Sequence, residues 1–235
     1  MTDDVDSRDK NIHIAIIPDG NRRYARSMSK PVWWGHVKGA QKLKEVANWC
    51  LDEPDVGMVS VYALSTENLN RKKEELDKLW SIYNREFNSL VGDSNIKKQG
   101  LSIRIVGDSS MWRKDVRAAA KDLMNATKDY TRGVLNILLA YGSQFEIINS
   151  ARKLVKKGIS TVPPVEDSFR KFLMVSEPVD LIIRTGGEHR LSNFLLYQSA
   201  YAEIYFSDAL WPAFSKKEFK KILTWYRNRE RRIGR

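Results

Sequence analysis

Residues 13–26 read HIAIIPDGNRRYAR. The apolar start of this stretch has the length and the isoleucine content of a buried β-strand. Pro18 removes a backbone donor and Asp-Gly-Asn is typical of a turn, so the strand is expected to end there. A carboxylate, turn amides and three arginines after a strand suit a metal-bound polyphosphate, with Asp19 holding the divalent cation. A strand, a tight turn and a solvated basic helix fit the same letters equally well.

Strand-like and helix-like segments alternate along the rest of the chain. Short apolar runs predict further strands at residues 56–64, 101–106, 134–139, 179–183 and 202–206. Apolar residues at helical spacing predict helices at residues 35–51, 72–91, 114–128, 146–157, 169–174 and 215–229. This alternation predicts an α/β fold with a central, mostly parallel sheet of about six strands covered by helices. No linker divides the chain, so residues 1–235 are expected to form a single domain, with residues 1–11 flexible.

The composition is that of a globular protein. Of the 235 residues, 42% are hydrophobic and 29% are charged. No apolar run approaches the roughly 20 residues that span a bilayer, and the acidic first residues lack the basic-then-apolar order of a signal peptide. Cys50 is the single cysteine, which rules out an internal disulfide and suits a reducing compartment. We therefore expect a cytoplasmic protein.

Positive charge is concentrated near the C-terminus. The net charge is +11, and residues 215–235 contain nine Lys or Arg against two Glu. Such a surplus predicts an anionic partner: nucleic acid, a membrane surface or a phosphorylated small molecule. The tail alternates apolar and basic residues as a core-facing amphipathic helix does, which disfavours nucleic acid. A peripheral contact between the tail and a membrane surface stays open.

Polar segments follow three of the predicted strands, at residues 19–26, 65–71 and 184–193. Ligands of open parallel sheets bind beyond the carboxyl ends of the strands, so these segments are expected to meet. In the third segment two adjacent glycines allow close approach to a ligand, Arg184 and Arg190 offer forked donors to phosphate, and Ser192 adds a hydroxyl. A Gly-Gly turn with surface arginines is the plainer interpretation.

Several common catalytic signatures are absent from the sequence. It contains no glycine-rich dinucleotide fingerprint, no P-loop and no nucleophile elbow. One cysteine and three scattered histidines cannot build a zinc site. His13 lies inside an apolar strand and is expected to be a core histidine with satisfied polar atoms.

The polar segments, taken together, carry a resemblance to a known family. The motifs are DGNRRYA at residues 19–25, Gly-His at 35–36, STENLNR at 65–71 and DLIIRTGGEHRLSNFLL at 180–196, followed by Glu203 and Trp211-Pro212. On these motifs the chain resembles the cis-prenyltransferases, whose best-known members make undecaprenyl diphosphate, over nearly its whole length. The other prenyl-coupling family is all-α and uses D-D-x-x-D clusters, which this sequence lacks.

The resemblance implies a Mg²⁺-dependent prenyltransferase. Such an enzyme condenses isopentenyl diphosphate with an allylic prenyl diphosphate and leaves a new cis double bond. It implies an α/β fold with a hydrophobic tunnel for the growing chain, and members usually form homodimers. A short Arg-x-Gly tail occurs in part of the family and reaches the partner's site, and Arg232-Ile233-Gly234 matches it.

The resemblance also assigns site residues. Asp19 would hold Mg²⁺ with His189 and Glu203. The allylic diphosphate would be held by Gly20, Asn21, Arg23, His36 and Arg71. Arg22 and Glu67 are also expected to bind substrate. The homoallylic diphosphate would be held by Arg184, Arg190 and Ser192. Catalytic roles fall to Asp19, Asn21, Ser65 and Asn68, the last two near the reacting carbons.

The sequence departs from the family pattern around the allylic site. Arg22 replaces a glycine, Tyr24 replaces a tryptophan, Val32 stands where arginine is frequent, and Leu69 replaces another tryptophan. Ser143-Gln144 stands in place of Gly-Arg. These changes leave the choice of allylic substrate open. They also leave open an irregular reaction, in which the two prenyl units are not joined head to tail. A non-catalytic subunit of a heteromeric enzyme is an alternative from another class, which the retained site residues disfavour.

Large side chains predict a short- or medium-chain product. In the family the prenyl chain enters a tunnel floored partly by the helix after the second motif, and here the relevant segments carry Trp80, Tyr83, Phe87, Leu138 and Leu139. These residues would stop elongation early if they filled the tunnel. Their helical spacing fits ordinary core packing as well.

Overall fold

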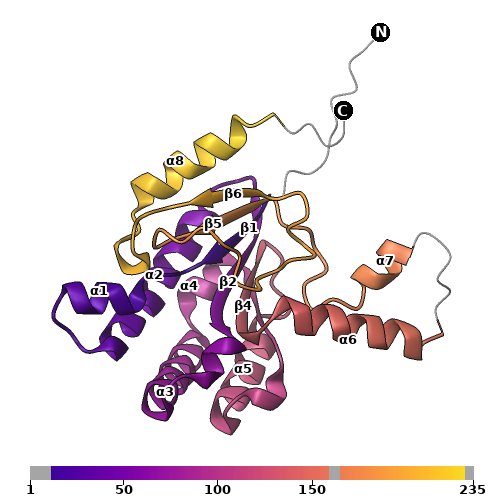
Figure 1. The fold of residues 1–235 in the computed structure, drawn as a ribbon, viewed down its shortest axis with the longest axis horizontal. Helices are drawn as coiled ribbons and strands as arrows, with labels where there is room; N and C mark the ends of the chain where they lie inside the picture. The colour runs from indigo at the N-terminus through magenta and orange to yellow at the C-terminus, as the bar shows by residue number, and fades with distance from the viewer. Residues whose placement is uncertain (1–11, 159–164, 231–235) are drawn as a thin grey trace.

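Six parallel strands form one sheet in the order β3-β4-β2-β1-β5-β6. The structure is a computed structural model that describes residues 12–158 and 165–230. The strands are β1 (Ile12–Ile17), β2 (Val56–Ser65), β3 (Leu101–Val106), β4 (Gly133–Tyr141), β5 (Leu181–Arg184) and β6 (Glu203–Phe206). The predicted parallel α/β fold is therefore confirmed (Figure 1).

Eight helices and three short 3₁₀ turns surround the sheet in the described residues. The helices are α1 (Asn21–Ser27), α2 (Val32–Leu51), α3 (Lys73–Leu90), α4 (Ser94–Gln99), α5 (Lys114–Thr127), α6 (Ser143–Lys156), α7 (Val165–Arg170) and α8 (Lys216–Arg227). The 3₁₀ turns are η1 (Glu67–Asn70), η2 (Ser109–Met111) and η3 (Trp211–Ala213). The predictions for residues 1–11 and for the Arg232–Gly234 tail lie outside the described residues.

The two faces of the sheet are packed differently. Side chains alternate along β1, so that Ile14 and Ile16 join one buried cluster while Ala15 and Ile17 join the other. The first cluster also contains apolar residues of α2, α3, α5 and α8. The second is filled by residues of the stretch between α7 and β6, namely Val175, Val179, Phe194 and Leu195. Helices dominate one face, and an irregular segment covers much of the other.

A row of buried, hydrogen-bonded polar side chains joins three adjacent strands, β1, β2 and β4. His13 Nε2 lies 2.7 Å from Ser60 Oγ, and Asn136 Nδ2 donates to the same hydroxyl at 3.0 Å. His13 Nδ1 lies 2.9 Å from the carbonyl of Pro178. Burial lowers the pKa of His13 below its ordinary value. The predicted core histidine is confirmed, and its ring pins β1 to β2 and to the start of β5.

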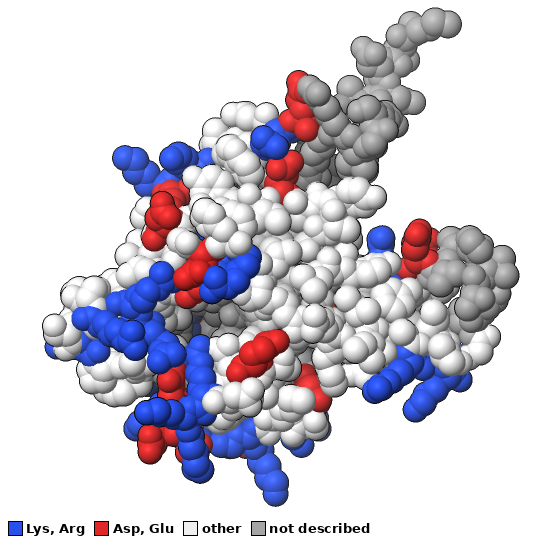
Figure 2. All heavy atoms as spheres, in the orientation of Figure 1, with Lys and Arg blue, Asp and Glu red and all other residues white. Residues whose placement is uncertain are grey.

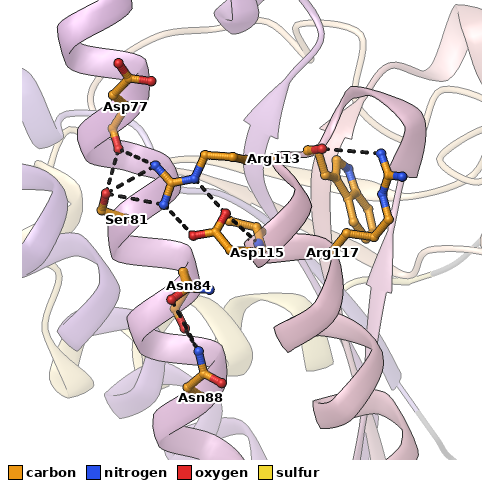
Figure 3. A network of polar contacts seen from close by, with 9 residues as sticks. Asp77, Ser81, Asn84, Asn88, Arg113, Asp115 and Arg117 are labelled. Carbon is orange, nitrogen blue, oxygen red and sulfur yellow. Dashed lines mark hydrogen bonds and ion pairs between the residues drawn. The ribbon is translucent and has the colours of Figure 1, made fainter.

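Arg113 braces α3 against the start of α5 (Figure 3). Its guanidinium lies 3.4 Å from both the Asp77 carbonyl and the Ser81 hydroxyl of α3, while Asp115 holds it at 2.7 and 2.8 Å. Arg113, held by Asp115 of its own helix, thus links the start of α5 to α3. This link bears on the site, since α3 forms a wall of the apolar cavity described below.

Three predicted helices differ from the observed ones by three residues or more at an end. α6 begins at Ser143 rather than at residue 146. α2 begins at Val32 rather than at residue 35. The helix predicted at residues 169–174 ends at Arg170, because the amides of Met174 and Val175 donate to the buried Glu146 carboxylate at 2.6 and 3.2 Å. α4 was not predicted, although Asp93 caps its start in the usual way. Within the described residues, no helix is both long and apolar enough to cross a membrane.

Candidate active site

Asp19 and Arg184 meet at the carboxyl edge of the sheet. β1 and β5 are neighbours in register, with Ile17 opposite Arg184, so the residues that follow β1 lie beside the end of β5. Arg184 Nη2 donates to Asp19 Oδ2 at 2.9 Å, and Arg23 Nη2 lies 3.4 Å from Asp19 Oδ1. The Arg184 side chain is 4% exposed whereas that of Asp19 is 32% exposed. The buried Arg184 guanidinium therefore holds the Asp19 carboxylate at the open carboxyl edge of the sheet.

The backbone around Asp19 is fixed from three sides. Its carbonyl accepts from the Trp211 amide and from Thr185 Oγ1, both at 2.9 Å. Gly20 follows with φ 111°, and a Cβ there would come within 2.9 Å of Leu210. The turn thus requires glycine both for its conformation and for its space. Asp19 is held in place before any ligand binds.

Asn21 is half-buried at the crossing of α1 and α2. A Cβ at Gly39 would lie 2.3 Å from Asn21 Oδ1, so α2 needs a glycine for α1 to come this close. Within the described residues Asn21 Oδ1 is buried and has no hydrogen-bond partner. An unsatisfied buried acceptor costs about 1–3 kcal/mol. It is a free acceptor at the rim of the cavity described next.

A polar cavity of about 290 Å³ opens beside Asp19. We call it the polar cavity; four of its lining residues are arginines, and the lining comprises Pro18, Asp19, Gly20, Asn21, Arg22, Arg23, Arg26, His36 and Arg71. Figure 2 shows positive side chains gathered around a hollow on this side of the molecule, near α1. Four guanidinium groups around one carboxylate suit a polyanion with a bound cation.

Glu75 gathers the cations on the α3 side of the polar cavity. Its Oε1 accepts from Arg71 Nη1 at 3.0 Å, lies 3.3 Å from His36 Nε2, and lies 3.9 Å from Arg22 Nε. Burial, and after it the Arg71 guanidinium, lowers the pKa of His36, so the ring is neutral at neutral pH. Glu75 was not among the predicted site residues. Its place in the first turn of the predicted helix, four residues after Arg71, was the available signal.

The second polar segment is tied together by its own side chains. Asn68 Nδ2 donates to Ser65 Oγ at 2.6 Å, and Asn68 Oδ1 accepts from Arg71. Ser65 ends β2, so its hydroxyl starts at the same sheet edge as Asp19. Glu67 accepts from Asn193 Nδ2 at 2.9 Å, which links this segment to the third one.

The third polar segment folds back over Arg184. Arg184 Nη1 donates to Ser192 Oγ at 2.7 Å and to the Arg190 carbonyl at 2.5 Å, while Arg184 Nε is buried without a partner among the described residues. The Arg190 side chain is 60% exposed and pairs with Glu188. Ser192 and Asn193 have φ of 51° and 65°. Left-handed backbone at non-glycine residues is strained and clusters at functional sites.

An apolar cavity of about 200 Å³ adjoins the polar one. We refer to this cavity as the tunnel, as a label for its lining residues only. It shares Pro18, Asn21 and His36 with the polar cavity. Apolar residues of α2, α3, β2, β3 and β4 line it, among them Ala40, Leu43, Ala47, Leu79, Ile82, Tyr83, Phe87, Leu90, Leu101, Ile103, Leu135 and Ile137. Along α2 it extends from His36 to Asn48, which is roughly 18 Å at the helical rise. One ligand can therefore place a charged head group in the polar cavity and a hydrocarbon tail in the tunnel.

Only some of the residues expected to fill the tunnel line it. Tyr83 and Phe87 do so, whereas Trp80, Leu138 and Leu139 do not. Leu138 belongs to the cluster on the other face of the sheet, because side chains alternate along β4. Leu139 and Trp80 pack in the first cluster, away from the cavity lining.

The comparisons with known proteins agree with this layout. A profile of the family described as "Putative undecaprenyl diphosphate synthase" matches residues 17–234. The chain is 41% identical over 229 residues to the tritrans,polycis-undecaprenyl-diphosphate synthase (geranylgeranyl-diphosphate specific) of Pyrococcus horikoshii, covering 95% of this chain and 86% of that protein. The chain belongs to the undecaprenyl diphosphate synthase family.

Other members of the family support the same assignment. The synthase of the same name from Methanopyrus kandleri is 44% identical over 229 residues, covering 95% of this chain and 84% of that protein. Lavandulyl diphosphate synthase from Lavandula x intermedia, solved with dimethylallyl diphosphate, has a TM-score of 0.86 at 30% identity, covering 95% and 98% of the two chains. A probable undecaprenyl diphosphate synthase from Campylobacter jejuni gives 0.80 at 32%, with the same coverage. This family member is therefore a prenyltransferase of the cis-prenyl diphosphate synthase type.

The three predicted metal ligands, Asp19, His189 and Glu203, do not come together in one chain within the described residues. Glu203 pairs with Leu181 at the amino end of β5, whereas Asp19 lies at the carboxyl end, and Glu203 accepts from Arg229 at 3.1 Å. His189 stacks on Phe206 with ring centres 4.7 Å apart. In the described ranges no three His, Cys, Asp or Glu side chains are placed to hold a metal together. The strand length separates Glu203 from Asp19, which the sequence motif alone cannot show.

Two departures from the family pattern have local structural roles. Tyr24 stacks on Trp34 with ring centres 5.8 Å apart, which ties α1 to α2. Ser143 begins α6, where its amide donates to the Asn193 carbonyl and its hydroxyl accepts from Leu196. The Ser143 contacts fasten the third polar segment to the start of α6.

Proposed function

We propose that this enzyme uses Mg²⁺ to condense isopentenyl diphosphate with an allylic prenyl diphosphate, head to tail, adding cis units. One observation carries the proposal: the polar cavity and the tunnel meet at Pro18, Asn21 and His36. A molecule with a diphosphate head and a hydrocarbon tail fits across that junction. The retained Asp19, Arg71, Arg184 and Ser192 supply the charge and hydrogen bonds that two such substrates require.

The residues present fit a magnesium ion shared with a diphosphate. Mg²⁺ is usually bound by one or two carboxylates together with substrate phosphates and water, rather than by a full set of protein ligands. Asp19 offers one carboxylate, and Asn21 Oδ1 is a buried acceptor without a protein partner in the described ranges. When bound, the ion would neutralise charge that develops on the departing diphosphate. We propose Asp19 as its protein ligand within this chain.

The chain's own residues bind and orient the two substrates. Arg22, Arg23 and Arg71 would hold the allylic diphosphate in the polar cavity, where positive charge is already in place when the carbon–oxygen bond breaks and the electron pair leaves with diphosphate. The remaining allylic cation is attacked by the double bond of isopentenyl diphosphate, and a proton is then lost.

Isopentenyl diphosphate would be bound by the third polar segment. Arg184 already holds Ser192, and its Nε, buried without a partner within the described chain, remains to be satisfied. Arg190 is exposed in its pair with Glu188, and we propose that it turns to the second diphosphate. Asn68, oriented by Ser65 and Arg71, would lie near the reacting carbons.

For the product we propose a chain longer than the sequence predicts. The tunnel is not closed by Trp80, Leu138 or Leu139, and its far end is lined by polar side chains such as Asn95 and Gln99. The names of the similar archaeal synthases specify undecaprenyl products and geranylgeranyl diphosphate. We therefore propose geranylgeranyl diphosphate as the preferred primer. A short- or medium-chain product is the competing outcome of the same assay.

We also propose a homodimer formed through α6 and the edge of the sheet. Ile148 and Val155 are seven residues apart on α6, so they share one face of the helix, and they are 53% and 76% exposed. Tyr201, just before the edge strand β6, is 80% exposed. Exposed apolar side chains on a helix and an unpaired edge strand are both typical of a subunit interface.

Turnover assays test the proposed reaction directly. The purified chain with Mg²⁺ is given isopentenyl diphosphate together with dimethylallyl, farnesyl or geranylgeranyl diphosphate, and each substrate alone. We expect linear products with new cis double bonds, assigned by NMR, and loss of turnover when the metal is chelated. Branched products would show irregular coupling, and no turnover with any pair would indicate a non-catalytic subunit.

A further inference from the structure

The turn between α1 and α2 projects from the molecule. We define the corner as residues 26–33, which are all exposed except the half-buried Val32. Met28 is 51% exposed and Trp33 is 46% exposed. The turn is ordered by bonds from the Lys30 amide to the Ala25 carbonyl at 2.8 Å and from the Trp34 amide to the Pro31 carbonyl at 3.0 Å. Two large apolar side chains are thus held out in solvent by a fixed backbone.

The corner lies in a strongly basic stretch. Residues 21–44 contain seven Lys or Arg and no Asp or Glu. Within the described part of the chain, Arg26 and Lys30 take part in no ion pair. The positive side chains around α1 are visible in Figure 2. The corner therefore combines uncompensated positive charge with an exposed tryptophan and methionine.

The C-terminal helix, whose charge first suggested a membrane contact, is different. On α8, Lys216 pairs with Asp52 at 2.9 Å, Lys220 pairs with Glu53, and Arg227 pairs with Asp55 at 2.5 Å. The acidic loop before β2 thus neutralises much of the basic face of this helix. Lys217 and Lys221 of α8 remain without an ion pair among the described residues, but no large apolar side chain of this helix is exposed. Of these two basic surfaces, the corner is the one that joins unpaired positive charge to exposed apolar side chains.

We propose that the corner docks this enzyme on an anionic phospholipid bilayer. Tryptophan prefers the boundary between headgroups and acyl chains, and basic side chains beside it are attracted to anionic lipids. Single-stranded nucleic acid would instead need aromatic rings set in a basic groove, whereas Trp33 stands on a protruding turn. Arg26 belongs both to the corner and to the polar cavity, so docking brings the substrate site to the lipid surface.

The position of the corner leaves it free in the proposed dimer. α1 and the start of α2 lie at the end of the molecule opposite α6 and α7 (Figure 1). The biological reason for docking, delivery of a hydrocarbon product to a bilayer, rests on the proposed function. Docking on the bilayer needs no turnover, so the docking proposal and the proposed function can fail separately.

Co-sedimentation with vesicles tests the proposal on the full chain. Vesicles of phosphatidylcholine alone are compared with vesicles of phosphatidylcholine and phosphatidylglycerol in equal parts. We expect binding to the anionic vesicles, and Lys30→Glu should weaken it by about fivefold or more, since each basic side chain near such a surface contributes about 1 kcal/mol. Lys221→Glu on α8 makes the same change in net charge and should leave binding nearly unchanged.

The apolar contribution is tested by a second pair of variants. Trp33→Ser should weaken binding to anionic vesicles even at high salt, where the charge contribution is screened. Met111→Ser removes an apolar side chain that is 42% exposed and lies outside the corner, and it should leave binding to the vesicles unchanged. Thermal unfolding of each variant checks the fold, and Lys30→Glu alters a fully exposed turn, so it keeps the test valid if Trp33→Ser unfolds.

Three results would overturn the proposal. The first is no binding of the unaltered chain to anionic vesicles. The second is an equal loss for Lys30→Glu and Lys221→Glu, which would mean that net charge alone drives binding. The third is binding of a single-stranded oligonucleotide, lost in the corner variants, without vesicle binding.

Discussion

At the scale of single residues, the site depends on a carboxylate and a cation that hold each other in place. Arg184 is almost fully buried, and its contact with Asp19 leaves the carboxylate one-third exposed at the cavity. Burying a guanidinium is costly unless it is paired. The pair therefore ties the stability of the sheet edge to the geometry of the site.

Asp19→Asn is expected to abolish most of the activity. The amide keeps an acceptor for Arg184 but loses the charge proposed to hold Mg²⁺, so we expect kcat/KM to fall by about 10²-fold or more. Initial rates at saturating Mg²⁺ measure this, with thermal unfolding to confirm the fold. Asp129→Asn, at an exposed position, is the matched control. Normal turnover by Asp19→Asn would remove Asp19 from the metal role.

Glu75→Gln tests a positioning role. Without the charge on Glu75, Arg71 and His36 lose their shared anchor, and we expect KM for the allylic diphosphate to rise by about tenfold, the loss of one charge-assisted hydrogen bond. kcat should change less, and KM for isopentenyl diphosphate should stay near its original value. Glu74→Gln, on the exposed side of the same helix, is the control. An equal rise in both KM values would contradict the prediction.

At the scale of elements, the centre of the sheet is held by a polar chain as well as by apolar packing. His13, Ser60 and Asn136 come from β1, β2 and β4, which are adjacent in the sheet. Each of the three side chains is buried. This row of hydrogen bonds is therefore stable only while the His13 ring is neutral and its partners are aligned.

The stability of the protein should therefore fall in mild acid. The pKa of His13 is lowered in the folded state, chiefly by burial, from an ordinary value of 6.5. Below about pH 6.5 the unfolded chain binds a proton that the folded chain does not, so the free energy of unfolding decreases as pH falls, by up to about 1.4 kcal/mol per pH unit. Urea unfolding above and below pH 6.5 measures the slope.

A pair of histidine variants assigns that slope. His13→Gln should lower stability at neutral pH and reduce the slope in this window, leaving the contribution of His36, whose pKa is also lowered by burial. His189→Gln, at an exposed ring, should leave the slope as it is in the unaltered chain. If both variants keep the original slope, the effect does not come from His13.

The α2–α3 wall of the tunnel should control product length. Ala47 lines the tunnel and is 7% exposed, so Ala47→Leu would narrow it. We expect a shift to shorter products and a stability cost of about 1–3 kcal/mol from overpacking. Chromatography of the products measures the shift. Ala118→Leu on the exposed side of α5 is the control, and an unchanged product distribution for Ala47→Leu would show that the chain does not pass there.

At the scale of the whole molecule, we expect the two ends of the molecule to have different tasks. The polar cavity and the corner lie at the α1–α2 end, and the exposed face of α6 lies at the other (Figure 1). Self-association through α6 would thus leave both substrate entry and membrane docking open.

Sedimentation analysis checks the proposed dimer. Ile148→Lys combined with Val155→Lys places two charges on the exposed face of α6, and we expect the dimer to dissociate to monomers because desolvating unpaired charges is costly. Met111→Lys, also at an exposed apolar side chain, should leave the dimer intact. A dimer that survives the double substitution must use another face.

Much of this protein could be predicted from its sequence alone. The strand that ends at Pro18 and the alternation of elements are local patterns, since period and turn chemistry are set by neighbours in the chain. The motifs grouped Asp19, Arg71 and Arg184 in one site, and the structure places the first two in one cavity and the third within hydrogen-bond distance of Asp19.

Tertiary structure alone decided the rest, because it depends on which strands become neighbours. Glu203 belongs to a family motif, but parallel pairing with β5 puts it at the far end of the sheet from Asp19. Leu138 has the size to block a tunnel, but the alternation along β4 turns it to the opposite face. Glu75 pairs with Arg71 as a local neighbour, but it reaches His36 and Arg22 only because α3 packs beside α2 and α1, and no local pattern contains that packing.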